Sequence, residues 1–170
     1  MTPTEVLPLY LIDISCVERL NVSGKGGKES TIIDLLPTAS RNTKPLFDLE
    51  IKNGIKPIRI EIKKQKNLQW FDIRKYHNLS QEDREIVLLF INHGKHGIDL
   101  IAAIQLGSFL DFVLSKADLK EFGWSAECIK KAHALTRPDQ YPKLQFKAGL
   151  RVRDLINEHR ELFQVIYESQ

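Results

Sequence analysis

The sequence predicts an α/β or α+β fold in which helices flank a central mixed β-sheet. A hairpin is indicated by the Asn-Gly pair inside residues 44–65, and the apolar runs at 86–92 and 98–106 are typical of buried strands. Apolar residues recur at helical spacing near both ends of the chain. With 170 residues, 42% of them hydrophobic and 28% charged, the chain is expected to form one folded domain, residues 1–170.

The first elements expected are helices separated by a glycine-rich loop. Residues 6–20 carry a helical apolar spacing, although a strand through the same residues is an alternative. Residues 21–30 form a flexible loop whose glycines resemble a phosphate loop. The Gly-Lys pair is followed by Glu29, however, where such a loop needs Ser or Thr, so no nucleotide site is predicted. A short helix is expected at 29–37.

The next expected element is the hairpin, which turns at Asn53-Gly54. A two-residue turn would place Asp48 opposite Arg59 and diagonal to Glu61, with about 7 Å between diagonal backbone positions. On one face stand the apolar residues Phe47, Leu49, Ile51, Ile58, Ile60 and Ile62, and on the other stand Asp48, Glu50, Lys52, Arg59, Glu61 and Lys63.

Helices and strands alternate through the rest of the chain. Residues 69–85 are irregular and then helical, with Ser80 as a favourable N-cap before an acidic first turn. The run at 86–92 favours a strand buried on both faces, and 98–106 a second strand. The remaining predicted elements are helices at 115–123 and 125–137, a late strand at 141–149, and an amphipathic helix at 150–166 with Leu155, Ile156, His159, Leu162 and Phe163 on one face.

The polar face of the hairpin carries a candidate catalytic group. Asp48 and Glu61 can converge on one hard cation, and Mg²⁺ takes oxygen ligands from one or two protein carboxylates. Lys63, two residues after Glu61, projects to the same side and can hold a water or a phosphate oxygen. Polar strand faces are common in antiparallel sheets, so this spacing alone is a weak signal. The reaction that this candidate group predicts is metal-assisted phosphodiester hydrolysis.

Positive charge gathers around this hairpin and favours a polyanionic partner. The whole chain has a net charge of +3. Residues 52–75 alone hold eight basic against two acidic side chains, an excess of six. Such a patch attracts phosphates. The basic residues are Lys52, Lys56, Arg59, Lys63, Lys64, Lys66, Arg74 and Lys75, against Glu61 and Asp72.

The segments "PLFD" (45–48) and "IEIKKQ" (60–65) together resemble the PD-(D/E)XK nuclease superfamily, with small type II restriction endonucleases nearest in size. The resemblance covers the order of elements over residues 29–106. It implies that Asp48 and Glu61 are metal ligands, with the backbone carbonyl of Ile62 as a third, and that Lys63 positions or deprotonates the attacking water. The family's proline usually directly precedes the aspartate. Here it stands three residues earlier, and the candidate accessory residues are Glu29, Glu50 (the substitute for Asp48) and Gln65.

The resemblance implies an endonuclease that uses Mg²⁺, with Mn²⁺ as a substitute, to cut double-stranded DNA at a specific short sequence. A homodimer is expected, because one such site cuts one strand and a two-fold pair cuts both strands of a palindrome. The C-terminal part, residues 115–170, is expected to serve DNA recognition or dimerisation. The candidate DNA-binding residues are Lys64, Lys66, His77, Lys143, Gln145 and Lys147.

Two other functions fit the same residues. A Holliday-junction resolvase or repair nuclease of the same superfamily would share the site, whereas a non-catalytic nucleic-acid-binding domain would use only the basic side chains. His93 and His96 are better explained by a glycine-containing turn than by a metal site. Cys16 and Cys128 form no disulfide framework or zinc signature, so a reducing, cytoplasmic setting is expected. No apolar run approaches the roughly 18 residues needed to span a bilayer, so no membrane contact is expected.

Overall fold

A computed structural model describes residues 32, 34, 39–41, 47–52, 56–64, 70–72, 79–114, 143–145 and 151–169. Ile32 and Asp34 are helical, in agreement with the short helix expected at 29–37. The elements expected at 6–20, 21–30, 115–123 and 125–137 lie outside the described residues.

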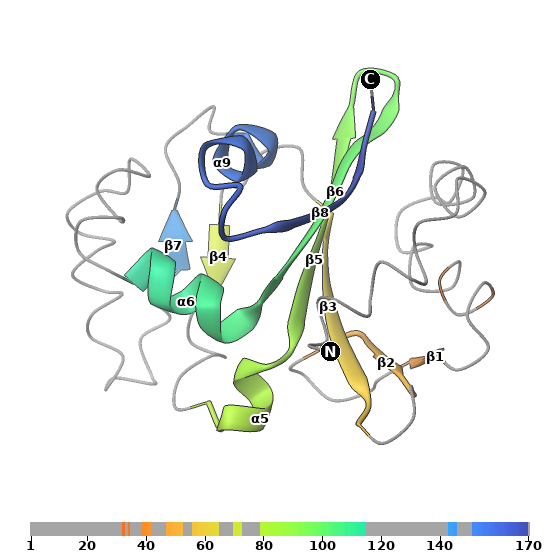
Figure 1. The fold of residues 1–170 in the computed structure, drawn as a ribbon, viewed down its shortest axis with the longest axis vertical. Coiled ribbons are helices and arrows are strands. Elements are labelled where there is room, and N and C mark those ends of the chain that lie inside the picture. The colour runs from red at the N-terminus through yellow and green to blue at the C-terminus, as the bar shows by residue number, and fades with distance from the viewer. Residues whose placement is uncertain are drawn as a thin grey trace.

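A six-stranded mixed sheet forms the centre of the described fold (Figure 1). The strands are β1 (Ala39–Arg41), β2 (Leu49–Ile51), β3 (Ile58–Lys64), β5 (Val87–Gly94), β6 (Gly97–Gln105) and β8 (Gln164–Glu168), in the order β1-β2-β3-β5-β6-β8. Strands β3 and β5 are parallel, and every other neighbouring pair is antiparallel. This mixed sheet with flanking helices confirms the predicted α+β class.

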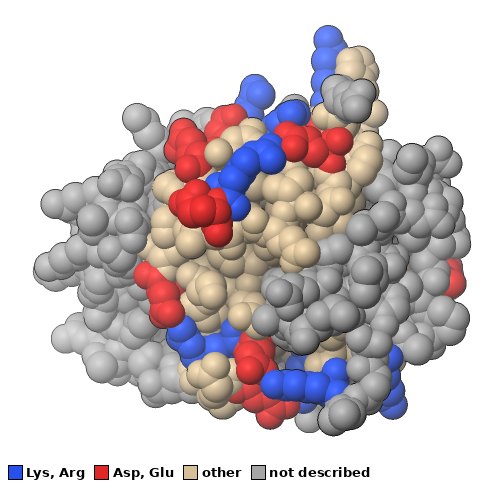
Figure 2. All heavy atoms as spheres, viewed as in Figure 1, with Lys and Arg blue, Asp and Glu red and all other residues tan. Residues whose placement is uncertain are grey.

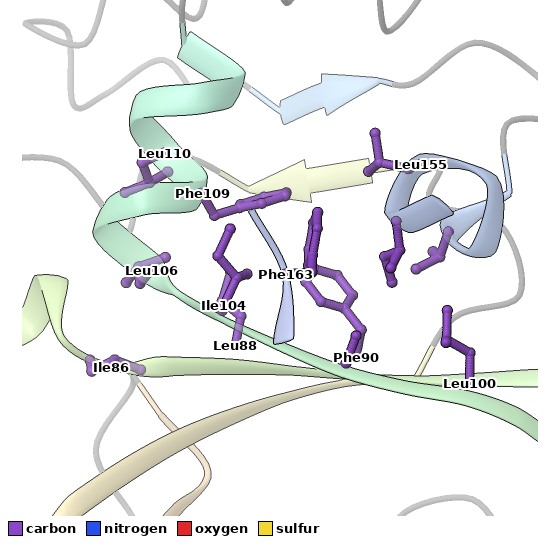
Figure 3. Close-up of a cluster of buried hydrophobic side chains, with 13 residues drawn as sticks. Ile86, Leu88, Phe90, Leu100, Ile104, Leu106, Phe109, Leu110, Leu155 and Phe163 are labelled. Atoms are coloured by element: carbon purple, nitrogen blue, oxygen red, sulfur yellow. The ribbon is translucent and has the colours of Figure 1, made fainter. Parts of the chain in front are cut away.

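One face of the sheet is covered by two helices, α6 (Leu106–Leu114) and α9 (Val152–Glu158), which lie on the same side in Figure 1. Their apolar side chains form a cluster with those of β5 and β6, shown in Figure 3. Phe90 lies at its centre, with ring centroids 5.7 Å from Phe109 and 6.0 Å from Phe163. We call this side of the sheet the α6–α9 face.

The opposite face carries a second apolar cluster built from the alternate residues of the same strands. Leu49, Ile51 and Ile60 are fully buried there, together with Val87 and Leu89 from β5. Ile32 from the N-terminal helical turn packs into the same cluster. Strand β5 is thus buried on both faces, which confirms the prediction made from its continuous apolar run.

Two smaller elements confirm other predictions. Helix α5 (Gln81–Arg84) begins after Ser80, whose hydroxyl accepts a hydrogen bond from the backbone N–H of Asp83. Strand β7 (Lys143–Gln145) falls inside the expected late strand at 141–149 and pairs antiparallel with β4 (Trp70–Asp72), which was not predicted. No helix among the described residues is long and apolar enough to cross a membrane.

The prediction of one helix over 150–166 is wrong. Helix α9 ends at Glu158, and after a turn the chain forms β8, which pairs with β6. The "QVIYE" sequence of β8 contains β-branched and aromatic residues that favour a strand, and pairing with β6 satisfies their backbone groups. Leu162, expected on the apolar helix face, is exposed in the turn.

Two further elements were not predicted. Strand β1 lies in a polar stretch without apolar alternation, so only pairing with β2 reveals it. Helix α6 begins at Leu106, which had been assigned to the end of the preceding strand. Its "LGSFLDFVL" sequence is apolar almost throughout, and such short runs do not distinguish a helix from a strand by periodicity.

The hairpin exists as predicted, but its register differs by two residues. Glu50 lies opposite Arg59 and Leu49 opposite Ile60, and Asp48, one residue before β2, donates its backbone N–H to the carbonyl of Ile60, so Asp48 does not lie opposite Arg59. A connection longer than the two residues Asn53-Gly54 accounts for the shift. Because the shift is two residues, every side chain of the paired strands keeps its predicted face.

Phe47 departs from the predicted alternation. It packs against the cluster on the α6–α9 face, whereas Leu49 and Ile51 belong to the opposite cluster. The chain bends at Asp48, one residue before β2 begins, and this bend breaks the two-residue period.

Candidate active site

Strand β3 carries two of the three predicted catalytic residues, Glu61 and Lys63. Glu61 and Lys63 alternate with the buried isoleucines of β3, and their register partners on β5 are Leu88 and Phe90. Leu88 and Phe90 belong to the cluster on the α6–α9 face, so Glu61 and Lys63 lie on that face too. The polar side of β3 therefore faces the helix-covered half of the molecule.

Asp48 is held beside β3 by a hydrogen bond from the backbone. The N–H of Ile62 donates to Asp48 Oδ2 at 2.7 Å, and the N–H of Asp48 donates to the carbonyl of Ile60 at 2.8 Å. The carboxylate thus takes the place of a backbone acceptor just beyond the end of the β2–β3 ladder. This contact holds the Asp48 carboxylate against the backbone of Ile62, the residue between Glu61 and Lys63.

Glu61 is a buried carboxylate with a cationic partner. The residue is 7% exposed, and Lys63 Nζ donates to Glu61 Oε1 at 3.2 Å. Burial of an ionised group without a partner is strongly unfavourable, so the lysine stabilises this carboxylate. Of the three residues that the sequence predicted as one group, Glu61 and Lys63 contact each other, and Asp48 is hydrogen-bonded to the backbone of Ile62, which stands between them.

Glu50, the middle residue of β2, belongs to a different group of charged residues. Arg59 contacts Glu50 at 3.4 Å and Glu82 of α5 at 2.9 Å, and its guanidinium lies 5.3 Å from the ring centroid of Phe47. Figure 2 shows charges of both signs intermixed around α5. Glu50 therefore forms part of an ion-pair network that attaches α5 to the hairpin. Its partner in this network is Arg59.

The donor set at the Asp48 end suits a hard cation held by few protein ligands. No group of three or more His, Cys, Asp or Glu side chains converges on a metal position within the described residues. Mg²⁺ binds through one or two carboxylates and keeps several waters, so two carboxylates meet its requirement. A strand residue directs its N–H and C=O to the same side, so the Ile62 carbonyl points toward the Asp48 side as well.

The other predicted site residues are only partly described. Lys64 ends β3, and Lys143 and Gln145 lie in β7, but nothing is described of their side chains. His93 ends up in β5, while His96 occupies the turn that Gly97 closes with a φ of 113°. The remaining candidates, Glu29, Gln65, Lys66, His77 and Lys147, lie outside the described residues.

Sequence reasoning missed a second polar group on the same face of the sheet. Asn92 and Asp99, on β5 and β6, are hydrogen-bonded to each other at 2.7 Å, and Arg153 of α9 contacts Asp99 at 2.9 Å. The signal that could have found it is a carboxylate inside the apolar run 98–106, because buried charges require partners.

Comparison with known proteins adds no assignment to this geometry. The sequence matches no protein-family model, and no curated protein matches it significantly.

Proposed function

We propose that the chain is a Mg²⁺-dependent endonuclease that hydrolyses phosphodiester bonds of double-stranded DNA at a specific short sequence, as type II restriction enzymes do. The observation that supports this proposal most is that Asp48 accepts a hydrogen bond from the backbone N–H of Ile62, which stands between Glu61 and Lys63, and that Lys63 contacts Glu61. The hairpin belongs to a mixed sheet whose next strand, β5, runs parallel to β3. That arrangement is compatible with a restriction-endonuclease-like core.

In this proposal Asp48, Glu61 and the carbonyl of Ile62 hold the cation. A bound Mg²⁺ would supply charge stabilisation at the phosphate and lower the pKa of a water molecule. Glu61 contributes a carboxylate that burial keeps in one place. Lys63 lies within hydrogen-bonding distance of Glu61, so it can position the water or a phosphate oxygen beside the same carboxylate.

A non-catalytic binding domain explains the acidic residues less well. A protein that only grips phosphates gains from Lys and Arg, but Asp48 and Glu61 would repel the nucleic acid unless a cation lay between them. A resolvase or repair nuclease would share the site and differ in the DNA structure that it recognises. A homodimer remains the expected state for cutting both strands.

The test is cleavage of supercoiled plasmid DNA with Mg²⁺ and, in parallel, with excess EDTA. We expect discrete fragments in Mg²⁺ and intact plasmid in EDTA. Asp48→Asn and Glu61→Gln should each slow cleavage by about 100-fold or more, because each removes a negatively charged oxygen that would hold the Mg²⁺.

Glu50→Gln is the matched control, since it neutralises a carboxylate on the same hairpin that is engaged by Arg59. It should cut at nearly the normal rate. Melting temperatures of all three variants establish that they are folded. Unchanged cleavage by folded Asp48→Asn and Glu61→Gln proteins would refute the assignment, as would cleavage that persists in EDTA.

A further inference from the structure

A cavity of about 450 Å³ lies between the tip of the β5–β6 hairpin and the start of α9. Its described lining includes Asn92, Lys95, Asp99, Arg151 and Arg153. This volume is within the range of small-molecule sites. The cavity is lined by polar and charged groups, and the function proposed above does not use it.

Asn92 presents a buried acceptor at this cavity. The residue is 4% exposed, and its Nδ2 donates to Asp99 Oδ1 at 2.7 Å. A carboxylate accepts hydrogen bonds, so it fixes the amide with the nitrogen toward Asp99 and the oxygen away from it. Among the described residues no donor reaches Asn92 Oδ1. A buried acceptor without a partner is unfavourable, so a ligand that brings an N–H or O–H donor gains affinity there.

The charges around the cavity favour an anion. Arg153 Nη1 lies 2.9 Å from Asp99 Oδ2, which balances the carboxylate that lines the cavity. Lys95 and Arg151 are exposed and form no ion pair with another described residue. Two cationic side chains thus remain at the cavity after Asp99 is matched. A phosphate group suits them, since arginine and lysine both bind phosphate oxygens.

The cavity lies next to the candidate active site. Lys63 is the register partner of Phe90, and Asn92 follows Phe90 on the same face of β5. Strand β5 neighbours β3 in the sheet, so Phe90 lies beside Lys63. Asn92 lies two residues further along β5, and two residues of a strand span about 7 Å. Consecutive nucleotides of one strand could therefore occupy the two places.

We infer that this cavity binds a single unstacked nucleotide of the nucleic acid. Its phosphate contacts Arg151 and Lys95, and an N–H of its base donates to Asn92 Oδ1. The choice of a nucleotide rests on the proposed function. A base stacked inside a duplex cannot reach the side chain of a residue that is only 4% exposed, whereas an unpaired or extruded base can enter a pocket and be read along its edge.

The inference is tested by calorimetric titration of the full chain in EDTA, where no cutting is expected. The ligands are deoxyadenosine monophosphate, abasic deoxyribose 5-phosphate and inorganic phosphate. The nucleotide should bind about 10-fold tighter than the abasic phosphate, because only the nucleotide carries a base whose N–H can donate to Asn92.

Variants separate the two contacts. Arg151→Ala should weaken the nucleotide and the abasic phosphate alike, by about 10-fold, because it removes a phosphate contact. Asn92→Leu, of similar size, should weaken only the nucleotide, to the level of the abasic phosphate. Arg41→Ala loses one positive charge at an exposed residue of β1, outside the basic patch around the hairpin and outside the described lining of the cavity, and it should change neither affinity.

Equal affinities of the normal protein for nucleotide and abasic phosphate would overturn the role of Asn92, even if Asn92→Leu failed to fold. An Arg151→Ala protein indistinguishable from Arg41→Ala would overturn the phosphate contact. Cleavage of DNA without nucleotide binding would refute the nucleotide site and leave the proposed nuclease activity standing. Nucleotide binding without any Mg²⁺-dependent cleavage would refute the proposed nuclease activity and leave the nucleotide site standing.

Discussion

Glu61 and Lys63 differ in burial, and this difference decides what each contributes to stability. The side chains of Glu61 and Lys63 are 9% and 18% exposed. Loss of the lysine leaves a carboxylate that water reaches poorly. Loss of the carboxylate leaves an amine on a long, flexible stem that reaches water more easily. Removal of Lys63 should therefore lower the free energy of unfolding more than removal of the Glu61 charge.

We expect Lys63→Met to lower the free energy of unfolding by about 1–3 kcal/mol, because it leaves a buried charged group without that partner. Glu61→Gln should change it by less than about 1 kcal/mol, since catalytic residues are often not optimal for stability. Denaturant unfolding measures both. If Glu61→Gln is the more destabilising substitution, the burial argument is wrong.

The residues of the hairpin show how far sequence alone reaches at this scale. Alternation predicted the faces of β3 correctly, because the two-residue period needs only local information. The partner of Arg59 was wrong, since the register depends on a connection whose length the Asn-Gly signal understated. The contact between Asp48 Oδ2 and the Ile62 N–H was not predictable, because it depends on a bend at the strand end.

At the level of elements, the β5–β6 hairpin depends on one glycine. Gly97 has a φ of 113°, in a region that side chains with a Cβ rarely adopt. It pairs with Gly94, where an added Cβ would lie 2.5 Å from Asp99 Oδ2. The turn thus requires glycine for its backbone at one position and for space at the other.

Gly97→Ala should destabilise the protein by about 1–2 kcal/mol, the penalty of a left-handed conformation for a residue with a Cβ. Lys95→Ala, in the same turn, is exposed and should change stability by less than about 0.5 kcal/mol. Thermal unfolding of the two variants side by side is the measurement. Equal melting temperatures would show that the turn tolerates alanine.

Strand β8 is attached by an ion pair whose strength depends on pH. Arg160 Nη2 lies 2.6 Å from Glu168 Oε1, and this hydrogen bond holds the pKa of Glu168 below its usual value while it raises that of Arg160. A carboxyl group with a lowered pKa in the folded state stabilises the fold above its unfolded pKa of about 4.3. That contribution is lost as pH falls through the lower folded value.

We therefore expect exchange of the β8 amide protons to accelerate as pH falls below about 4, relative to an Arg160→Gln protein measured at each pH. Both side chains are partly exposed, so the effect is small and should shrink further in high salt. The Arg160→Gln protein lacks the partner and should show a weaker pH dependence. Identical pH profiles for the two proteins would contradict the role of this pair.

For the whole molecule, the central feature is a sheet with an apolar cluster on each face. The clusters use Leu88 and Phe90 on one side and Val87 and Leu89 on the other, and neither contains Asp48 or Glu61. The core can therefore persist when the candidate site is changed. The double burial of β5 was predictable because its apolar run has no polar alternation.

The C-terminal part shows where prediction from sequence fails at this scale. The apolar residues of 150–166 fit a helical period throughout, yet the chain leaves the helix after Glu158 because β6 offers an open position for β8. The open edge of β6 exists only once the sheet has assembled, so the local sequence of 150–166 does not reveal it. Asn92, Asp99 and Arg153 likewise meet only after three distant elements pack together.

The central claim is that Lys63 serves chemistry, and the most direct test compares Lys63→Ala with Lys56→Ala. Both lysines have a glutamate partner, Glu61 for Lys63 and Glu85 for Lys56, but Lys56 is 61% exposed and remote from Asp48. Duplex DNA binding is measured in Ca²⁺, which should support binding without cutting because its looser shell places water poorly. Cleavage is measured in Mg²⁺.

We expect Lys63→Ala to bind DNA nearly as well as the normal protein and to cut it about 100-fold or more slowly. Lys56→Ala should bind and cut almost normally. Equal and small losses of cleavage rate in the two folded variants, or a loss in Lys63→Ala that its weaker DNA binding fully explains, would contradict the claim and leave Lys63 as one more basic residue on a nucleic-acid-binding surface.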